Sequence, residues 1–372
     1  MPVLDRLFLL LFHNWPVMKI KSVKFWKEGL ELTLPYTIAF QTVSSVENLF
    51  VRIELENGQS GLGAGSPAEF ITGENFSGSM DLLEKHLEDL LLGKDIRQLP
   101  ALLKKLDAIF GNSPAANAAI DIALFDAFTK YLGIPLVDFF GREHQKLPTS
   151  ITIGIKSLEE TVTEARQRVK EGFRIIKLKT GLEVDKDIAV FSRLRETVGK
   201  NVKIRVDANQ GYNFESLNKF IKAVKPLDLE FMEQPFPQGN PDDMRQLPWD
   251  IRSLAAADED LHSMKDAMKL AVKPFPYRIF NIKLMKCGGI RNARRIALVA
   301  EQAGLHLMWG CMDESIISIA AALHAALASP ATRYLDLDGS IDLARDIVKG
   351  GFELKDGYLS TTGQPGLGVI PL

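Results

Sequence analysis

IIKLKTGLEVDKDIAVFSRLRETVGKNVKIRVD, residues 175–207, is the stretch that decides the fold class of this chain. It begins with a short apolar run, continues with an amphipathic segment of helical length over 185–198, and ends with a second apolar run. Strand, helix and strand in this order predict two parallel strands joined by a crossover helix. Each run also carries a charged side chain at its C-terminal end, Lys179 in the first and Asp207 in the second.

The same pattern repeats outward from this stretch, and eight apolar runs can be counted after Pro148. They cover residues 149–155, 175–180, 203–207, 230–233, 253–258, 278–284, 305–309 and 334–338. Segments of helical periodicity lie between them, among them 158–171, 185–198 and 290–303. Eight repeats predict an α/β fold closed into a barrel. An open, doubly wound sheet is the alternative, although no glycine-rich phosphate-binding turn follows the first run.

The part before the barrel has a different pattern. Residues 18–66 alternate apolar and polar side chains around two turn signals, Glu28-Gly29 and Glu56-Asn57-Gly58, which predicts a small antiparallel sheet. Residues 78–140 change to helical spacing, with a long apolar-faced helix over 115–132. We therefore expect an α+β domain over 18–145 and a barrel domain over 146–344. Periodicity does not place the tail over 345–372.

Residues 1–17 are expected to be an N-terminal extension. Their apolar run, Leu7 to Phe12, follows an acidic residue and precedes no small-residue cleavage site, which argues against a signal peptide. It is also far shorter than the roughly 20 residues that span a bilayer. Because a strand-like pattern begins at Met18, we expect translation to start there.

The composition narrows the class of protein. A formal net charge of -2 with 46% hydrophobic residues indicates a globular protein and offers no basic excess for nucleic acid. Two cysteines, Cys287 and Cys311, are too few for a disulfide framework, which favours a reducing compartment and a cytoplasmic location. We expect a small-molecule partner and neither nucleic acid nor a membrane. A homo-oligomer stays open.

Three acids stand at the ends of successive apolar runs. Asp207, Glu233 and Asp258 are each about 25 residues apart, the length of one strand-helix unit, so consecutive strands would place them side by side at one barrel face. Converging carboxylates repel one another unless a cation lies between them, and oxygen ligands completed by water suit Mg²⁺. The alternative is that each acid caps a helix or pairs with a base.

Three lysines accompany these acids. Lys177 and Lys179 lie two apart on one strand and point to the same face, while Lys283 lies one unit beyond Asp258, across the barrel mouth. Neighbouring ammonium groups and a metal would lower the lysine pKa, and a neutral lysine is a usable base. Lys179 and Lys283 could then remove a proton from one face of a carbon and return it on the other. Taken singly, each lysine would more often be a solvated strand-end charge, and its register with the acids is what favours a role as a base.

These residues carry a resemblance to a known family. KLK at 177–179, DAN at Asp207, EQP at Glu233, ADE at Asp258 and NIKLMKCGG from Asn281 resemble the signatures of the enolase superfamily, muconate-lactonizing subgroup. The resemblance implies a (β/α)₇β modified TIM barrel with an α+β capping domain, to which the segment 345–372 returns. It also implies proton abstraction beside a carboxylate, with Lys177 and the metal stabilising the charge that develops.

The eighth run suggests the reaction. It reads Tyr334-Leu-Asp-Leu-Asp-Gly339, so Asp336 and Asp338 share a face and would attract an ammonium group, unless they only form a strand-end turn. This Asp-x-Asp resembles the motif with which dipeptide epimerases hold the free amino terminus. Sugar-acid dehydratases are disfavoured because they carry a His-Asp pair where this chain has Lys283. A muconate cycloisomerase or o-succinylbenzoate synthase type of reaction, or a β-elimination, remains the alternative.

The expected substrate is a dipeptide, inverted at its C-terminal residue. The resemblance implies that Thr152, Cys311 and Asp313 line the pocket, and it aligns Gln41 with the arginine by which alanyl-glutamate epimerases pair a glutamate side chain. Without that cation we expect a small or apolar C-terminal residue such as alanine or valine, with an L-Ala-D/L-Glu epimerase as the alternative. A non-catalytic binding barrel would predict loss of a lysine or a metal acid, and none is missing.

Overall fold

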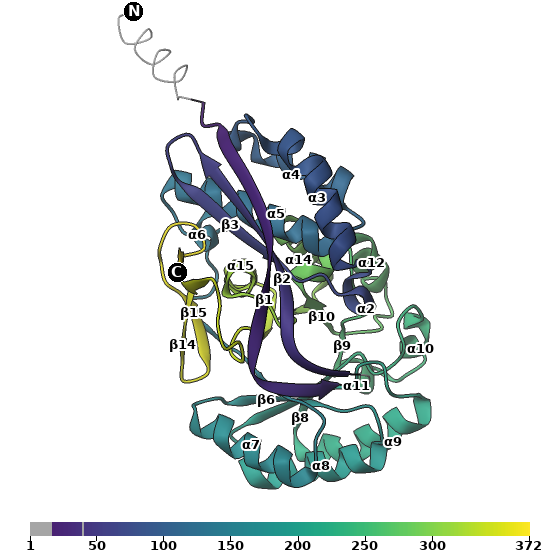
Figure 1. Ribbon diagram of the computed structural model, residues 1–372. Helices are drawn as coiled ribbons and strands as arrows, with labels where there is room; N and C mark the ends of the chain where they lie inside the picture. The colour runs from purple at the N-terminus through teal and green to yellow at the C-terminus, as the bar shows by residue number, and fades with distance from the viewer. Residues whose placement is uncertain (1–16, 39–40) are drawn as a thin grey trace, which may run out of the picture.

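The computed structural model describes residues 17–38 and 41–372 (Figure 1). Residues 1–16 of the predicted N-terminal extension lie outside the described residues. The chain forms an antiparallel sheet with its own helices, an eight-stranded parallel sheet surrounded by helices, and small C-terminal sheets. Both predicted arrangements, an α+β capping domain and a barrel built of strand-helix units, are therefore observed.

The N-terminal sheet consists of β1 (Ile20–Ile38), β2 (Gln41–Leu55) and β3 (Ser60–Gly65), all antiparallel. The turn predicted at 56–58 is confirmed, and the Gly58 N–H donates to the Leu55 carbonyl over 2.9 Å. The turn predicted at Glu28-Gly29 is wrong, because β1 runs through Gly29, which pairs with Glu47. Apolar and polar residues alternate on both sides of this glycine, and cross-strand pairing outweighs its turn preference.

Helices pack on this sheet, and the longest of them, α5 (Pro114–Leu132), is buried on nearly all sides. A Cβ added to Gly63 would lie 1.8 Å from the Ala119 carbonyl oxygen of α5, and Gly61 and Gly65 approach the same helix comparably closely. Glycines on β3 and alanines on α5 thus allow backbone to meet backbone. The other helices are α2 (Glu69–Thr72), α3 (Phe76–Leu91), η1 (Ile96–Gln98), α4 (Leu99–Phe110) and α6 (Leu136–Phe140).

The parallel sheet has the strand order β12-β11-β10-β9-β8-β7-β6-β5. Its members are β5 (Ile151–Ile153), β6 (Ile175–Lys179), β7 (Lys203–Asp207), β8 (Leu229–Glu233), β9 (Ala255–Ala257), β10 (Ile279–Ile282), β11 (His306–Gly310) and β12 (Thr332–Asp336). Each lies on one of the eight predicted runs, within a few residues, and the run 203–207 coincides with β7. A consecutive order of parallel strands with crossover helices is the arrangement of a (β/α) barrel.

Four helices of the outer layer begin with a side-chain cap, which fixes the end of the preceding loop. α7 (Leu158–Lys170) starts with a capping box between Ser157 and Glu160. The remaining elements of this layer are α8 (Val184–Val198), α9 (Phe214–Val224), η2 (Lys225–Leu227), α10 (Pro241–Arg245), α11 (Trp249–Arg252), α12 (Met264–Leu270), α13 (Leu284–Cys287), α14 (Ile290–Ala303) and α15 (Ile316–Leu327). Within residues 17–38 and 41–372, helices that combine the length and apolarity of a membrane span are absent.

The C-terminal tail returns to the N-terminal helices. β13 (Val348–Gly350) pairs with β16 (Val369–Pro371), and β14 (Phe352–Lys355) and β15 (Tyr358–Thr361) join β4 (Leu147–Pro148). The Leu367 N–H then donates to the Asp126 carboxylate of α5 over 2.8 Å. The N-terminal sheet in turn contacts the barrel domain, because the Thr33 N–H of β1 donates to the Asp342 carbonyl after β12 over 2.8 Å. The N-terminal sheet is thereby held against the loops at the carboxyl ends of the barrel strands (Figure 1).

Candidate active site

Charged side chains gather where five consecutive barrel strands end. Lys179, Asp207 and Glu233 are the last residues of β6, β7 and β8, and they are register partners in the sheet. Asp258 and Lys283 directly follow β9 and β10. β6 and β10 lie four strands apart in a barrel of eight, so Lys179 and Lys283 stand on opposite sides of the three acids. The predicted convergence of these five residues is therefore observed.

Lysines lie directly against the outer two acids. Lys179 Nζ donates to Asp207 Oδ2 over 2.7 Å, and Lys283 Nζ donates to Asp258 Oδ2 over 2.8 Å. Burial alone would raise the pKa of both carboxyls, but the neighbouring ammonium groups outweigh burial and hold each pKa below its ordinary value. Both acids are therefore carboxylates at neutral pH, with a candidate base at hydrogen-bond distance.

Lys177 lies in the centre of the site and is buried. Its Nζ lies 2.7 Å from a Glu233 carboxylate oxygen, 2.7 Å from one of Asp336 and 3.1 Å from one of Asp207. Burial favours the neutral amine, yet these three carboxylates raise the pKa of Lys177 well above its ordinary value, and the pKa of Lys283 is raised in the same way. The lowering of the pKa that the Lys177–Lys179 pair and a metal predict is not seen at Lys177, because carboxylates rather than ammonium groups are its nearest neighbours.

Lys286 is a site residue that the sequence analysis did not identify. It is buried one helical turn after Lys283, and its Nζ donates to the Asp258 carbonyl over 2.5 Å and to the Asp258 carboxylate. Asn281 Nδ2 similarly donates to Glu233 Oε1 over 2.7 Å. Both residues lie in the NIKLMK stretch, and their short distance in sequence from Lys283 could have identified them as site residues. Their contacts fix the orientation of two of the three acids.

The chemistry of the three acids fits a hard divalent cation. Glu233 is fully buried between the other two, and burial together with Asp207 and Asp258 raises its pKa to about 8. Mutual repulsion of this kind is relieved by a cation that oxygen ligands prefer, such as Mg²⁺. Within the described ranges no three acid, imidazole or thiol groups meet around one point. The Lys177 ammonium lies between Glu233 and Asp207 instead.

The eighth strand brings its two acids to the first strand. Asp336 is buried, and it accepts from Ser150 Oγ over 2.5 Å and from Lys177 Nζ over 2.7 Å. Asp338 lies just beyond β12 and accepts the Thr152 N–H over 2.7 Å. Burial and the Asp336 charge raise the pKa of Asp338 to about 6. Asp338 is the less engaged of the two acids.

The other predicted pocket residues are placed as follows. Cys311 lies beside the two acids, with its Sγ 3.2 Å from the Asp336 carbonyl oxygen, and both cysteines of the chain are free. Asp313 lies in the next loop, where its carbonyl accepts from Ser66 Oγ of the N-terminal domain over 3.5 Å. Gln41 begins β2, and its side chain lies outside the described part of the chain.

The loops after β7 and β8 hold three non-glycine residues with positive φ. Asn209, Gln210 and Gln234 have φ of 41°, 69° and 32°. Such conformations cost roughly 1–3 kcal/mol each and persist where surrounding contacts impose them. Asn209 Oδ1 accepts from Lys179 Nζ over 2.9 Å, and Gln234 Oε1 accepts the Asp258 N–H over 3.0 Å. The strained turns thus aim amide groups at a candidate base and a candidate metal ligand.

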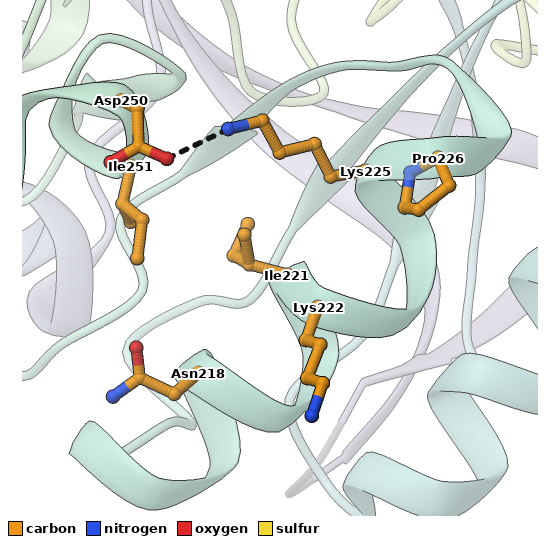
Figure 2. A pocket seen from close by; sticks show the side chains of 7 residues that line it. All are labelled: Asn218, Ile221, Lys222, Lys225, Pro226, Asp250 and Ile251. Atoms are coloured by element: carbon orange, nitrogen blue, oxygen red, sulfur yellow. Dashed lines mark hydrogen bonds and ion pairs between the residues drawn. The ribbon is translucent and has the colours of Figure 1, made fainter.

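Two hollows lie among the loops and helices around the barrel. One of about 460 Å³ is lined by Lys179 and by the loops after β5 and β6, with Ile155 and Leu182 among its apolar residues. The other, of about 370 Å³, is shown in Figure 2 and lies where α9 and α11 lead into the next strands, with a Lys225–Asp250 ion pair at its edge. Of the two, the first reaches the candidate site through Lys179, and neither is lined by Asp207, Glu233 or Asp258.

Comparison with known proteins relates most of the chain to one family. Residues 20–141 match the mandelate racemase/muconate lactonizing enzyme N-terminal domain, and residues 160–371 match the enolase C-terminal domain-like family. An L-Lys-D/L-Arg epimerase of Desulforapulum autotrophicum is 55% identical, covering 95% of this chain and 99% of that protein. An L-Lys-D/L-Arg epimerase of Methylococcus capsulatus is 51% identical, with the same coverage of both chains.

A solved structure shares the fold throughout. The dipeptide epimerase from Methylococcus capsulatus, complexed with Mg and the dipeptide L-Arg-D-Lys, superposes with a TM-score of 0.93 at 50% identity, covering 95% of this chain and 99% of that one. The chain therefore belongs to the mandelate racemase/muconate lactonizing enzyme family of the enolase superfamily, which includes dipeptide epimerases.

Proposed function

We propose that the protein is a Mg²⁺-dependent dipeptide epimerase that inverts the C-terminal residue of dipeptides with cationic side chains. The observation that carries the proposal is the placement of Lys179 and Lys283 on opposite sides of Asp207, Glu233 and Asp258. Two relatives that are more than half identical to this chain are named as epimerases of one cationic dipeptide.

The chain's own residues supply the acid-base chemistry. Asp207, Glu233 and Asp258 would hold Mg²⁺, which when bound stabilises the negative charge that develops on the substrate carboxylate. Carboxylates that hold Mg²⁺ attract the lysines less, which favours the neutral amine. Lys179 or Lys283, in its neutral form, then removes the proton from the carbon beside the substrate carboxylate, and the protonated lysine on the other side returns a proton to the opposite face. Lys177 donates to the carboxylate as its charge increases. Inversion requires both lysines, whereas removal of the proton requires one.

The amino terminus of the dipeptide would lie beside Asp336 and Asp338, where the last strand of the barrel approaches the first. Asp338 has an oxygen that is not engaged by a strong donor, since its contact with Cys311 Sγ is 3.8 Å long. A substrate ammonium group beside Asp338 and Asp336 would form charge-assisted hydrogen bonds in a buried setting. A free amino terminus is therefore part of what the site recognises.

The substrate side chains are proposed to be cationic, in place of the small or apolar residue that Gln41 suggested. The relatives named above do not support the apolar prediction. Replacing an arginine by a neutral glutamine removes the partner of an anionic side chain, but it places no barrier against a cationic one.

Deuterium exchange tests the proposal directly. We would incubate Lys-Arg, Ala-Val and Ala-Glu dipeptides with the protein and Mg²⁺ in D₂O and follow the mass increase of each. The proposal expects the fastest uptake with Lys-Arg, at its C-terminal residue. Faster uptake with Ala-Val or Ala-Glu would contradict the cationic substrate, and no uptake from any dipeptide would favour the cycloisomerase or elimination chemistry. Lys222→Met replaces a lysine in the hollow of Figure 2, outside the candidate site, and should leave the uptake from every dipeptide unchanged.

A further inference from the structure

The eight-stranded sheet is closed between its first and last strands by side chains. β5 and β12 are the ends of the strand order, and in the described ranges one backbone bridge joins them, between Thr149 and Leu335. The Thr149 hydroxyl accepts the Leu337 N–H over 2.9 Å, and Asp338 accepts the Thr152 N–H. We call residues 149–152 and 335–338 the barrel seam. Both candidate ammonium-binding acids belong to it.

Arg205 lies beneath this seam, inside the barrel. It is 1% exposed and stands two residues before Asp207 on β7, so its side chain points to the same interior face. Its guanidinium stacks on two aromatic rings, with Cζ 5.0 Å from the centroid of Phe231 and 5.1 Å from that of Tyr334. A buried arginine stays charged, so its position requires fixed partners on every side.

The partners of Arg205 lead to the seam. Nη1 donates to the Leu335 carbonyl over 2.7 Å and to Ser150 Oγ over 3.2 Å, while Nε donates to Glu230 Oε2 over 2.6 Å. The Ser150 hydroxyl donates in turn to Asp336 Oδ1 over 2.5 Å, and Lys177 binds the other oxygen. An unbroken set of contacts therefore runs from Arg205 through Ser150 to Asp336.

We propose that Arg205 and Ser150 are positioning residues that hold Asp336 in place for the ammonium group of the dipeptide. The inference rests on the proposed function, since it assigns Asp336 to the substrate amino terminus. A seam with a single backbone bridge cannot fix this carboxylate by strand pairing alone. The Ser150 hydroxyl fixes one oxygen of Asp336, and Arg205 fixes both that hydroxyl and the backbone of β12.

The consequence is specificity for a free amino terminus. If Asp336 is correctly oriented, it distinguishes a dipeptide from an analogue in which hydrogen replaces the amino group. If Ser150 loses its hydroxyl, the carboxylate turns more freely and this distinction decreases, while contacts at the substrate carboxylate remain. If Ser150 had a merely structural role, its substitution would weaken the binding of both ligands equally.

A double-mutant cycle between protein and ligand tests this. We would measure the Mg²⁺-loaded wild type and Ser150→Ala by calorimetry with a Lys-Arg dipeptide and with its desamino analogue. We expect Ser150→Ala to weaken binding of the dipeptide about tenfold more than binding of the analogue, the size of one hydrogen bond to a charged group. Equal losses for the two ligands, or no loss, would overturn the proposal.

Two further variants keep the test decisive. Arg205→Lys keeps the positive charge but loses the planar guanidinium donors. It should lower the preference for the dipeptide over its desamino analogue, and it should raise KM more than it lowers kcat. Arg252→Lys is the matched control, because Arg252 is also buried, stacks on Trp249 and donates to backbone carbonyls away from the barrel seam, so it should leave the preference unchanged. Binding without deuterium exchange in the wild type would reject the proposed function and leave this inference decided by the calorimetry. No binding of either ligand would overturn both.

Discussion

Variants of Lys179 and of Lys283 should differ in which stereoisomer of the substrate takes up deuterium. Because each faces the substrate carbon from its own side, we expect Lys283→Met to lower epimerisation by roughly 10²–10⁴-fold while deuterium uptake from one stereoisomer continues at Lys179. Lys179→Met should retain uptake from the other stereoisomer only. Mass spectrometry of each pure stereoisomer in D₂O measures this. If either variant exchanged both stereoisomers, the two-base arrangement would be wrong.

Asp338 should give the affinity for dipeptides a pH dependence. Its pKa is raised to about 6 by burial and by Asp336, so it is charged above that pH and neutral below it. We expect KM for a dipeptide to rise as the pH falls through about 6, because a neutral carboxyl no longer attracts the ammonium group. Asp338→Asn should have a high KM with no such step. A wild-type KM that is flat between pH 5 and 7.5 would contradict this.

The positions of the site residues were easier to predict from the sequence than their pKa values and their burial. Asp207, Glu233, Asp258 and the two lysines could be placed at one face from strand spacing alone. The raised pKa of Lys177 could not, since its sign depends on three carboxylates whose distances only the folded chain defines. Arg205 had a signal, a charge two positions before Asp207 on an inward face, but a strand arginine is ordinarily exposed, and its burial on Phe231 and Tyr334 is a tertiary feature.

Among the elements, the contact between α5 and α14 depends on one glycine. Asp121 of α5 accepts the Ile290 N–H at the start of α14 over 2.6 Å, and a Cβ on Gly289 would lie 2.6 Å from that carboxylate. Gly289 also has φ of 103° and ψ of -173°, a region that glycine alone adopts readily. The two domains therefore meet at a position that tolerates no side chain.

We expect Gly289→Ala to lower the free energy of unfolding by about 3 kcal/mol. Urea denaturation measures it. Gly304→Ala is the control, since Gly304 ends the same helix at φ of 68° with nothing near its Cβ position, and about 1 kcal/mol is expected there. Equal losses at the two glycines would show that the close approach to Asp121 is unimportant.

Strand and helix positions in the barrel follow closely from the sequence because their periods are regular. The helix predicted at 290–303 coincides with α14, and the run 203–207 with β7. Errors arose where a local signal competed with long-range pairing, as at Gly29 inside β1. Periodicity alone could not place the tail, because its short strands pair with β4 and with one another, and its contact with Asp126 joins residues far apart in the chain.

For the whole molecule, Mg²⁺ should stabilise the fold. A ligand that binds only the native state adds about 2.7 kcal/mol at a hundredfold excess over its Kd. We expect thermal unfolding to shift upward by several degrees on adding Mg²⁺ and to return on adding EDTA. Glu233→Gln should reduce this shift, since it removes one of three carboxylates. If this variant responded as strongly as the wild type, the three acids would not be the metal site.

The barrel seam also sets where the molecule opens most easily. Seven neighbouring strand pairs of the order are hydrogen-bonded, whereas β5 and β12 depend on one bridge and on the side chains of Thr149, Ser150 and Asp338. Amide protons of Ser150, Thr152 and Leu337 should thus exchange with solvent before those of β7 and β8. A dipeptide bound at Asp336 and Asp338 would protect them, so the substrate itself would close the ring of strands on which its turnover depends.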